Sequence, residues 1–235
     1  MEKAVWVIAH GSRNKHWVEL VDHEIRKVKS HYPIVTSFLE KVEGRLINDG
    51  IHQLQELRAK EVFVIPMFVS SGSTHIEETK SILFNHSNRL HFHFGSCMDD
   101  HFYVVQHMIN QAMQLSVNPE EEALLLIAHG SDESIFHERW ERILTSLVKQ
   151  LKEQTDYAQV HYATFLPHTI EKQLNQLKGL TTIVVPMFLS KGLFTDQKIP
   201  KAIEGYPVKY KGEAYLPSSW IAKWIESLIE TFQSV

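Results

Sequence analysis

The sequence contains almost no cysteine. Cys97 is the single one among 235 residues, which excludes a disulfide framework within the chain and a zinc or iron–sulfur site built on thiolates. An excess of positive charge is also lacking, because the formal net charge is −4, and a nucleic-acid-binding protein needs a basic surface. No apolar run approaches the roughly 20 residues of a membrane span, and no secretory signal is visible. We therefore expect a cytoplasmic protein that binds neither nucleic acid nor membrane.

Histidine, in contrast, is abundant, with 15 residues in the chain. Imidazole ligates metal ions and exchanges protons near neutral pH, so the positions of these side chains in the fold decide what they can do. The proportions of hydrophobic and charged residues, 43% and 22%, are typical of a folded globular protein. The length allows one large domain or two small ones.

The two halves of the sequence repeat one another. VWVIAHGS at residues 5–12 corresponds to LLLIAHGS at residues 124–131, and VFVIPMFVS at residues 62–70 corresponds to TIVVPMFLS at residues 182–190. The order is constant and the offset changes only slightly, which indicates a duplication with small insertions and deletions. We therefore predict two similar lobes, at residues 1–117 and 118–235.

Each half alternates short apolar runs with amphipathic stripes. Trp17, Val21, Ile25 and Val28, for example, recur at the spacing of one helix face. Strands separated by helices predict right-handed crossovers and a parallel sheet covered on both faces. The fold class is therefore α/β, with two doubly wound lobes. The candidate strands of the first half are residues 5–9, 34–39, 62–67 and 91–94.

Polar side chains follow three of these strands. His10 ends the first, Glu40 ends the second and His75 follows the third. The carboxyl ends of parallel strands form the usual ligand-binding edge of such sheets, so we expect the three side chains to meet there. Two imidazoles and a carboxylate suit Fe²⁺, Co²⁺, Ni²⁺ or Zn²⁺, and three protein ligands leave coordination positions open.

The second half serves as an internal control for this site. Its corresponding residues are His129, Pro167 and Thr195, so only one of the three candidate ligands is present. Residues needed for folding alone would be expected in both halves. We therefore predict one site, in the N-terminal half, with His129 in a structural role.

These residues also carry a resemblance to a known family. AHGSR after the first strand, FLE after the second and VIPMFVSSGSTH after the third resemble the class II tetrapyrrole chelatases, most of all the two-lobed sirohydrochlorin cobaltochelatases and ferrochelatases. The resemblance covers essentially the whole chain. It implies insertion of a divalent metal ion into sirohydrochlorin or a related tetrapyrrole, as in siroheme or cobalamin biosynthesis.

The resemblance also implies roles for individual residues. His10 and His75 would be the catalytic metal ligands, Glu40 would complete the metal site, and Glu43 would contact the macrocycle or assist proton removal. The metal (Fe²⁺, Co²⁺ or Ni²⁺) would be a substrate, no organic cofactor is implied, and a monomer is compatible with the pattern. The residues expected to contact the carboxylate-bearing ring are Arg13, Ser70, Ser71, Gly72, Ser73 and Thr74.

Some features depart from the family pattern and leave alternatives open. Gly44 stands where proline is usual, and the HIE segment ending at Glu77 is similar to that of the porphyrin ferrochelatases, so the exact macrocycle is not fixed. Glu77 and Glu78 would act in metal relay or simply stabilise a helix N-terminus. Two other functions remain: a binding protein that delivers metal or metallated tetrapyrrole without turnover, and an enzyme that holds an anion at the HGS turn.

Overall fold

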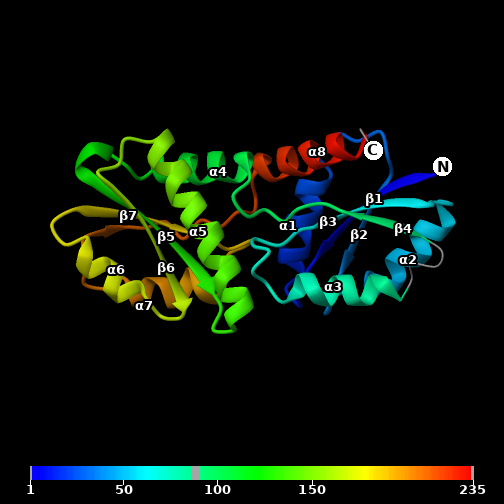
Figure 1. Ribbon diagram of the computed structural model, residues 1–235, viewed down its shortest axis with the longest axis horizontal. Helices are drawn as coiled ribbons and strands as arrows, with labels where there is room; N and C mark the ends of the chain where they lie inside the picture. Colours follow the sequence, from blue (N-terminus) through cyan, green and yellow to red (C-terminus); the bar gives the residue numbers. More distant parts are fainter. Residues whose placement is uncertain (1, 86–89, 234–235) are drawn as a thin grey trace. The chain divides into compact units, whose positions relative to one another are not determined.

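The computed structural model describes residues 2–85 and 90–233 and shows two four-stranded parallel sheets flanked by helices (Figure 1). The arrangement of these sheets and helices confirms the predicted α/β class with two doubly wound lobes. Within the described ranges, no helix has both the length and the apolar character needed to cross a membrane. The first elements are β1 (Lys3–Ala9), α1 (Lys15–Ile25), β2 (Ile34–Phe38), α2 (Ile47–Glu56), β3 (Glu61–Pro66), α3 (His75–Phe84), β4 (His91–Phe94) and α4 (Phe102–Met113). The later elements are the 3₁₀ turn η1 (Pro119–Glu121), β5 (Glu122–Gly130), α5 (Ser134–Gln154), β6 (Gln159–Leu166), α6 (Ile170–Gln176), β7 (Thr181–Pro186), the π-helical turn η2 (Phe194–Lys198), α7 (Ile199–Ala202), β8 (Val208–Lys209) and α8 (Ser219–Gln233).

Both sheets have the same topology. The strand order is β2-β1-β3-β4 in the first sheet and β6-β5-β7-β8 in the second, and every pair is parallel. The chain passes from β1 to β2 on one side of the sheet. It then crosses over β1 to form β3 on the other side, so the direction in which strands are added reverses at β1. Because parallel crossovers are right-handed, α1 lies on the face opposite to α2 and α3. The carboxyl ends of β1, β2 and β3 therefore lie side by side, which is where ligands bind in such sheets.

The central strand β1 is apolar because both faces of its sheet are covered. Every residue from Ala4 to Ala9 is fully buried, as expected for an interior strand of a parallel sheet. Trp6 packs with Ile51 and Leu54 of α2 in the core of one face. Its indole Nε1 donates a 2.9 Å hydrogen bond to the Ser37 hydroxyl of β2, so the polar atom of this buried ring is satisfied.

The chain divides into two compact units that exchange their last helices. The first unit contains the residues up to Asp99 together with those from Ile221 onward, and the second contains Asp100–Trp220. The sequence places the join at 117/118 instead, so α4 and most of α8 lie in the opposite units from those expected. The reason is physical: an amphipathic stripe reveals which face of a helix is buried, but not which sheet covers it. In the second unit, Gln111 of α4 donates a 3.0 Å hydrogen bond to the Ala214 carbonyl.

Phe232 of α8 anchors this helix in the first unit. Its ring is 2% exposed, stacks on Phe63 of β3 with centroids 4.9 Å apart and contacts Tyr32. We expect Phe232→Ala to lower the free energy of unfolding by about 3–5 kcal/mol and the melting temperature by roughly 10 °C, measured by circular dichroism. Val117→Ala is the control, because Val117 is 84% exposed. A loss below 2 °C for Phe232→Ala would contradict this role of α8.

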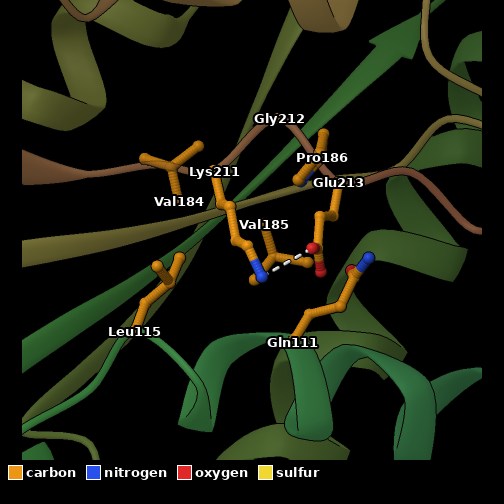
Figure 2. A pocket seen from close by; sticks show the side chains of 8 residues that line it. All are labelled: Gln111, Leu115, Val184, Val185, Pro186, Lys211, Gly212 and Glu213. Carbon is orange, nitrogen blue, oxygen red and sulfur yellow. Dashed lines mark ion pairs between the residues drawn. The ribbon is translucent and has the colours of Figure 1, made fainter.

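Each unit contains a cavity of its own. One in the second unit has a volume of about 10 Å³ (Figure 2), which has room for roughly one water molecule. The first contains a cavity of about 420 Å³ beside α3, which is in the size range of small-molecule pockets. The small cavity is lined by Gln111, Leu115, Val184, Val185, Pro186, Lys211, Gly212 and Glu213. The large cavity is lined by Pro66, Ser71, Ile76, Thr79, Lys80, Phe94, Gly95, Ser96, Cys97 and Asp99.

Candidate functional site

Backbone hydrogen bonds between the β1 and β2 segments continue past the end of β2. The backbone N–H of Leu39 donates to the Ala9 carbonyl at 3.0 Å, and that of Glu40 donates to the His10 carbonyl at 3.1 Å. Gly11 then turns the chain with φ of +101°, and a Cβ atom here would lie 1.9 Å from the carbonyl oxygen of Glu40. Only glycine permits this close approach, so the tight turn sets His10 and Glu40 next to each other.

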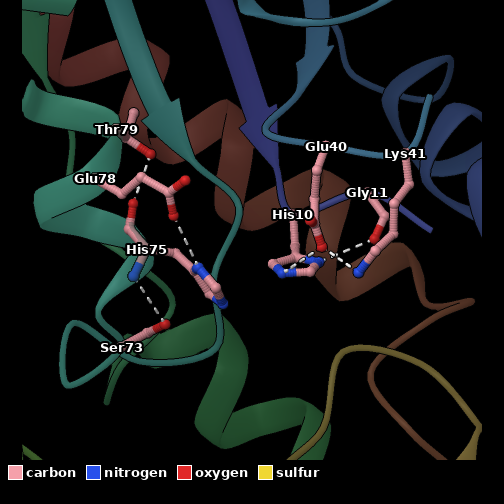
Figure 3. Close-up of polar contacts among 8 residues, drawn as sticks. All are labelled: His10, Gly11, Glu40, Lys41, Ser73, His75, Glu78 and Thr79. Atoms are coloured by element: carbon pink, nitrogen blue, oxygen red, sulfur yellow. Dashed lines mark hydrogen bonds and ion pairs between the residues drawn. The ribbon is translucent and has the colours of Figure 1, made fainter. Parts of the chain in front are cut away.

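His75 approaches the same place from the third strand. It is the first residue of α3, which follows β3 after a short loop. The His10 and His75 rings point towards one another (Figure 3), with centroids 4.3 Å apart and planes inclined at 63°. The structure therefore brings together the two imidazoles that the sequence places after separate strands.

Hydrogen bonds orient both rings. The Nδ1 atom of His10 lies 2.9 Å from the Gly11 carbonyl oxygen. A carbonyl can only accept, so Nδ1 carries the proton and Nε2 carries the lone pair when the ring is neutral. The Nδ1 atom of His75 lies 3.3 Å from Glu78 Oε2, and a carboxylate likewise accepts. Both rings are therefore held so that Nε2 is the nitrogen available to a ligand.

Glu40 is the third candidate donor. Its Oε1 lies 3.3 Å from His10 Nε2. Two ligands each about 2.1 Å from one metal ion are about 3.0–3.4 Å apart at common coordination angles, so this spacing suits a shared cation. The Lys41 ammonium pairs with the same carboxylate and, as the largest cause, holds the pKa of the Glu40 carboxyl below its usual range. Glu40 is therefore an ionised donor in neutral solution.

The donor atoms do not converge as they stand. In the described part of the chain, no group of three or more His, Cys, Asp and Glu side chains has the geometry of a preformed metal site. The carboxylate of Glu40 is engaged by Lys41, and the side chains of His10, Glu40 and His75 are 33%, 45% and 35% exposed. Neither cavity described above includes these three residues. The three side chains thus form an open, solvent-accessible cluster, and their donor atoms would have to move closer together to surround one ion.

The loop before α3 uses its backbone amides internally. The N–H of Ser71 donates to Asp99 Oδ1 at 2.6 Å, that of Gly72 to the Ser70 hydroxyl at 3.0 Å, and that of Ser73 to the Ser70 carbonyl. Ser70 and Gly72 are buried and Thr74 is exposed. These bonds fix the loop that presents His75. The Ser73 hydroxyl accepts from the His75 N–H at 3.4 Å and keeps its own proton to donate, and Thr74 is exposed.

Other candidate residues lie at the exposed rim. Arg13 follows the HGS turn and Glu43 follows the end of β2, and both are exposed. Glu77 and Glu78 both lie in the first turn of α3, but their partners differ: Glu78 contacts His75, whereas Glu77 pairs with Lys80 at 3.6 Å. The two carboxylates, which the sequence cannot tell apart, are therefore distinguished by the structure.

The second unit keeps the first histidine and replaces its partner. The Nδ1 atom of His129 lies 2.9 Å from the Gly130 carbonyl, as in the first unit. The ring facing it, however, is Phe194, with centroids 5.1 Å apart. Phe165 and Phe188 also pack on Phe194, so aromatic rings fill the place of the second imidazole. Thr195, the predicted counterpart of His75, is buried and bonds to Gly192 and Asp196.

Sequence reasoning missed Lys41, Phe194 and the distinct position of Glu78. The signal for Phe194 was a difference in loop length: counted from the proline that ends the third strand of each half, His75 is one position further along than Phe194. Lys41 gave no signal, because lysine next to glutamate in a loop usually belongs to a solvated surface.

Comparison with known proteins identifies the family. The model of the CbiX family matches residues 4–115 and again residues 123–226. The chain belongs to the CbiX family. The double match reproduces the internal duplication, and the predicted membership of the class II chelatases is thereby confirmed.

Individual relatives agree with the CbiX assignment. A sirohydrochlorin cobaltochelatase of Sulfolobus acidocaldarius is 27% identical over 66 residues, which make up 28% of this chain and 54% of that protein; the match thus spans about half the length of this curated relative. A structure of SirB from Bacillus subtilis with Fe³⁺ has a TM-score of 0.80 at 19% identity and covers 98% of this chain and 95% of that one. SirB from Bacillus subtilis subspecies spizizenii in complex with cobalt, described as a sirohydrochlorin chelatase, has a TM-score of 0.75 at 18% identity, with the same coverage. These structures establish a shared fold.

Proposed function

We propose that this protein inserts a divalent metal ion, Fe²⁺ or Co²⁺, into sirohydrochlorin or a closely related tetrapyrrole, a step of siroheme or cobalamin biosynthesis. The observation that carries the proposal is the pair of facing imidazoles with a carboxylate 3.3 Å from one of them. Membership of the CbiX family and the chelatase names of its relatives support the same reaction. Ni²⁺ also suits this donor set.

The donor set favours a metal ion that is held and then released. His10, His75 and Glu40 offer nitrogen and oxygen atoms, which bind borderline divalent ions. Three protein ligands leave positions through which the ion can begin to bind pyrrole nitrogens. The side chains are one-third to one-half exposed, so a large planar ring can approach the ion directly.

The same imidazoles can take up the protons that the reaction releases. Insertion forms bonds from the metal to the ring nitrogens, and two pyrrole N–H groups each lose one proton. When the ion leaves a histidine, the Nε2 lone pair becomes free and can accept one of these protons. His10 is the better acceptor, because its Nδ1–H is fixed on the Gly11 carbonyl and the adjacent Glu40 carboxylate stabilises the imidazolium that forms.

The rim residues would hold the substrate carboxylates. Arg13 provides an exposed guanidinium next to the HGS turn, and guanidinium binds carboxylate in bidentate fashion. The Ser73 and Thr74 hydroxyls lie immediately before His75 and can donate to the ring substituents. Glu43, exposed beyond the end of β2, would contact pyrrole N–H groups or assist proton removal.

A chelation assay tests the proposal. Purified protein is incubated anaerobically with sirohydrochlorin and either Co²⁺ or Fe²⁺, and the absorbance change on metallation is followed. We expect a rate at least about 100-fold above the spontaneous reaction, because positioning and proton transfer together commonly contribute that much or more.

The controls separate the proposed reaction from its rivals. Tight binding of ring and metal without any rate increase would refute the enzyme and favour a delivery protein. If Ser12→Ala abolished activity and His75→Ala left it intact, anion binding at the HGS turn would be the better explanation. Comparing Fe²⁺, Co²⁺ and Ni²⁺ under identical conditions identifies the preferred ion.

A further inference from the structure

The Glu40 carboxylate has two partners on the same oxygen atom. Oε1 faces His10 Nε2 at 3.3 Å and also pairs with the Lys41 ammonium, as Figure 3 shows. His10 directs a lone pair at this oxygen when its ring is neutral, because its proton lies on Nδ1. A cation between or beside these two groups offsets the repulsion, and Lys41 supplies one from within the chain.

The backbone of Lys41 has an unusual conformation. Its φ is +67°, in the left-handed region that residues other than glycine seldom adopt. Neighbouring side chains normally diverge, but here the ammonium of residue 41 contacts the carboxylate of residue 40. The conformation and the ion pair occur together at the end of β2.

The second unit has neither partner. There β6 ends at Leu166 and is followed by Pro167 and His168, so no carboxylate or ammonium follows the strand. An ammonium does lie near the His129–Phe194 pair, but it belongs to Lys198 of η2, which sits over the Phe194 ring at 4.3 Å. A lysine paired with a carboxylate directly after the second strand is thus found in the first unit and not in the second.

We propose that Lys41 is a competing cation: its ammonium occupies the Glu40 carboxylate when no metal is bound, and it weakens the hold on a bound metal so that the ion passes to the tetrapyrrole. This inference rests on the proposed chelatase function and makes Lys41 a positioning residue that acts through Glu40. A metal ion must displace the ammonium from Oε1 or share that oxygen with it. Either event lowers affinity for the ion and raises the rate of its release.

Electrostatics sets the size of the effect. With neutral imidazoles, the charges of Glu40 and Lys41 cancel and the Glu78 carboxylate behind His75 leaves one negative charge. Without the ammonium the site carries two negative charges and attracts a divalent ion more strongly. A unit charge about 6 Å from a divalent ion, in a water-like dielectric, changes the binding constant by roughly tenfold. Such an exposed interaction weakens with added salt.

The experiment compares Lys41→Met with the unchanged protein. Co²⁺ affinity is measured anaerobically from the visible absorption of bound Co²⁺, in competition with a chelator. We expect Lys41→Met to bind Co²⁺ about tenfold more tightly at low salt. Both the KM for Co²⁺ and the kcat of insertion into sirohydrochlorin should fall. Lys41→Gly, which suits the positive φ, should behave in the same way, whereas Lys41→Arg should restore ordinary values.

Two further variants show whether the effect is local. Lys60→Met removes an exposed lysine that pairs with Glu2 before the start of β3, and it should leave Co²⁺ affinity within twofold. In a Glu40→Gln background, Lys41→Met should change affinity less than threefold, because the contested carboxylate is gone. The inference is overturned if Lys41→Met raises Co²⁺ affinity equally in the Glu40→Gln background, or if Lys41→Met alone leaves Co²⁺ affinity unchanged.

If the unchanged protein binds Co²⁺ through His10 and His75 but never transfers it, the proposed function fails while the affinity effect of Lys41 is still measurable. The absence of histidine-dependent Co²⁺ binding would refute both.

Discussion

His10→Ala and His75→Ala are each expected to reduce metal insertion to the spontaneous rate, a loss of at least about 100-fold. Each change removes a nitrogen donor from the open site, and one lost ligand leaves a borderline metal ion with too few protein contacts to be held for transfer. Each also removes a proton acceptor for the pyrrole N–H groups. Anaerobic chelation kinetics and Co²⁺ titration measure both consequences separately.

His129→Ala is the matched control for these variants. His129 occupies the same strand end and makes the same 2.9 Å contact from Nδ1 to the following carbonyl, yet its facing ring is Phe194. We expect the metal-insertion rate of the His129→Ala protein to stay within twofold of the rate of the unchanged protein. Comparable losses from all three substitutions would contradict the one-site hypothesis. Melting temperatures within about 3 °C of the unchanged protein would show that the losses are not caused by unfolding, since the two site histidines are about one-third exposed.

The second large effect concerns the turn at Gly11. Gly11→Ala would place a Cβ atom 1.9 Å from the Glu40 carbonyl oxygen, at φ of +101°. The clash is with backbone, so the segment that bears Glu40 must move away from His10. We expect a loss of about 3 kcal/mol in the free energy of unfolding, a melting temperature lower by roughly 6–12 °C, and at least about 100-fold less activity even at temperatures where the variant is folded.

Gly130→Ala separates strain from function. Its Cβ would lie 2.0 Å from the Leu166 carbonyl oxygen at φ of +74°, so the destabilisation should be similar. No carboxylate follows β6, however, and the open histidine pair is in the other unit. The folded Gly130→Ala protein should therefore insert metal at close to the ordinary rate. If both glycine variants lost activity equally while folded, displacement of Glu40 could not be the cause.

The strands and the duplication were predictable because they depend on local composition. Buried parallel strands such as β1 must be apolar on both faces, and the repeated AHGS segments mark the same strand end in both halves. The juxtaposition of His10, Glu40 and His75 followed from one rule, that the carboxyl ends of parallel strands share an edge. The roles of these residues remain predictions that the substitutions above will test.

Other features depended on contacts that no local pattern records. The apolar stripe that includes Phe232 predicts a buried helix face. It does not show which of the two similar sheets that face covers, and in the structure Phe232 packs against β3. Glu77 pairs with Lys80 and Glu78 contacts His75, because the two side chains point in different directions from the first turn of α3. Lys41 reaches Glu40 from a backbone conformation that its residue type does not favour.

The exchange of the terminal helices has a consequence for biosynthesis. The first unit includes the chain from Ile221 onward, whereas the second unit is complete at Trp220. At about 5–20 residues per second, the ribosome needs roughly 6–24 seconds to pass from Asp99 to Ile221. During that interval Phe63 lacks its cover from Phe232, so the half that is made first is finished last. A stop codon between those of Asp99 and Phe232 therefore leaves the His10–His75 unit incomplete, even though every residue of the cluster has been synthesised.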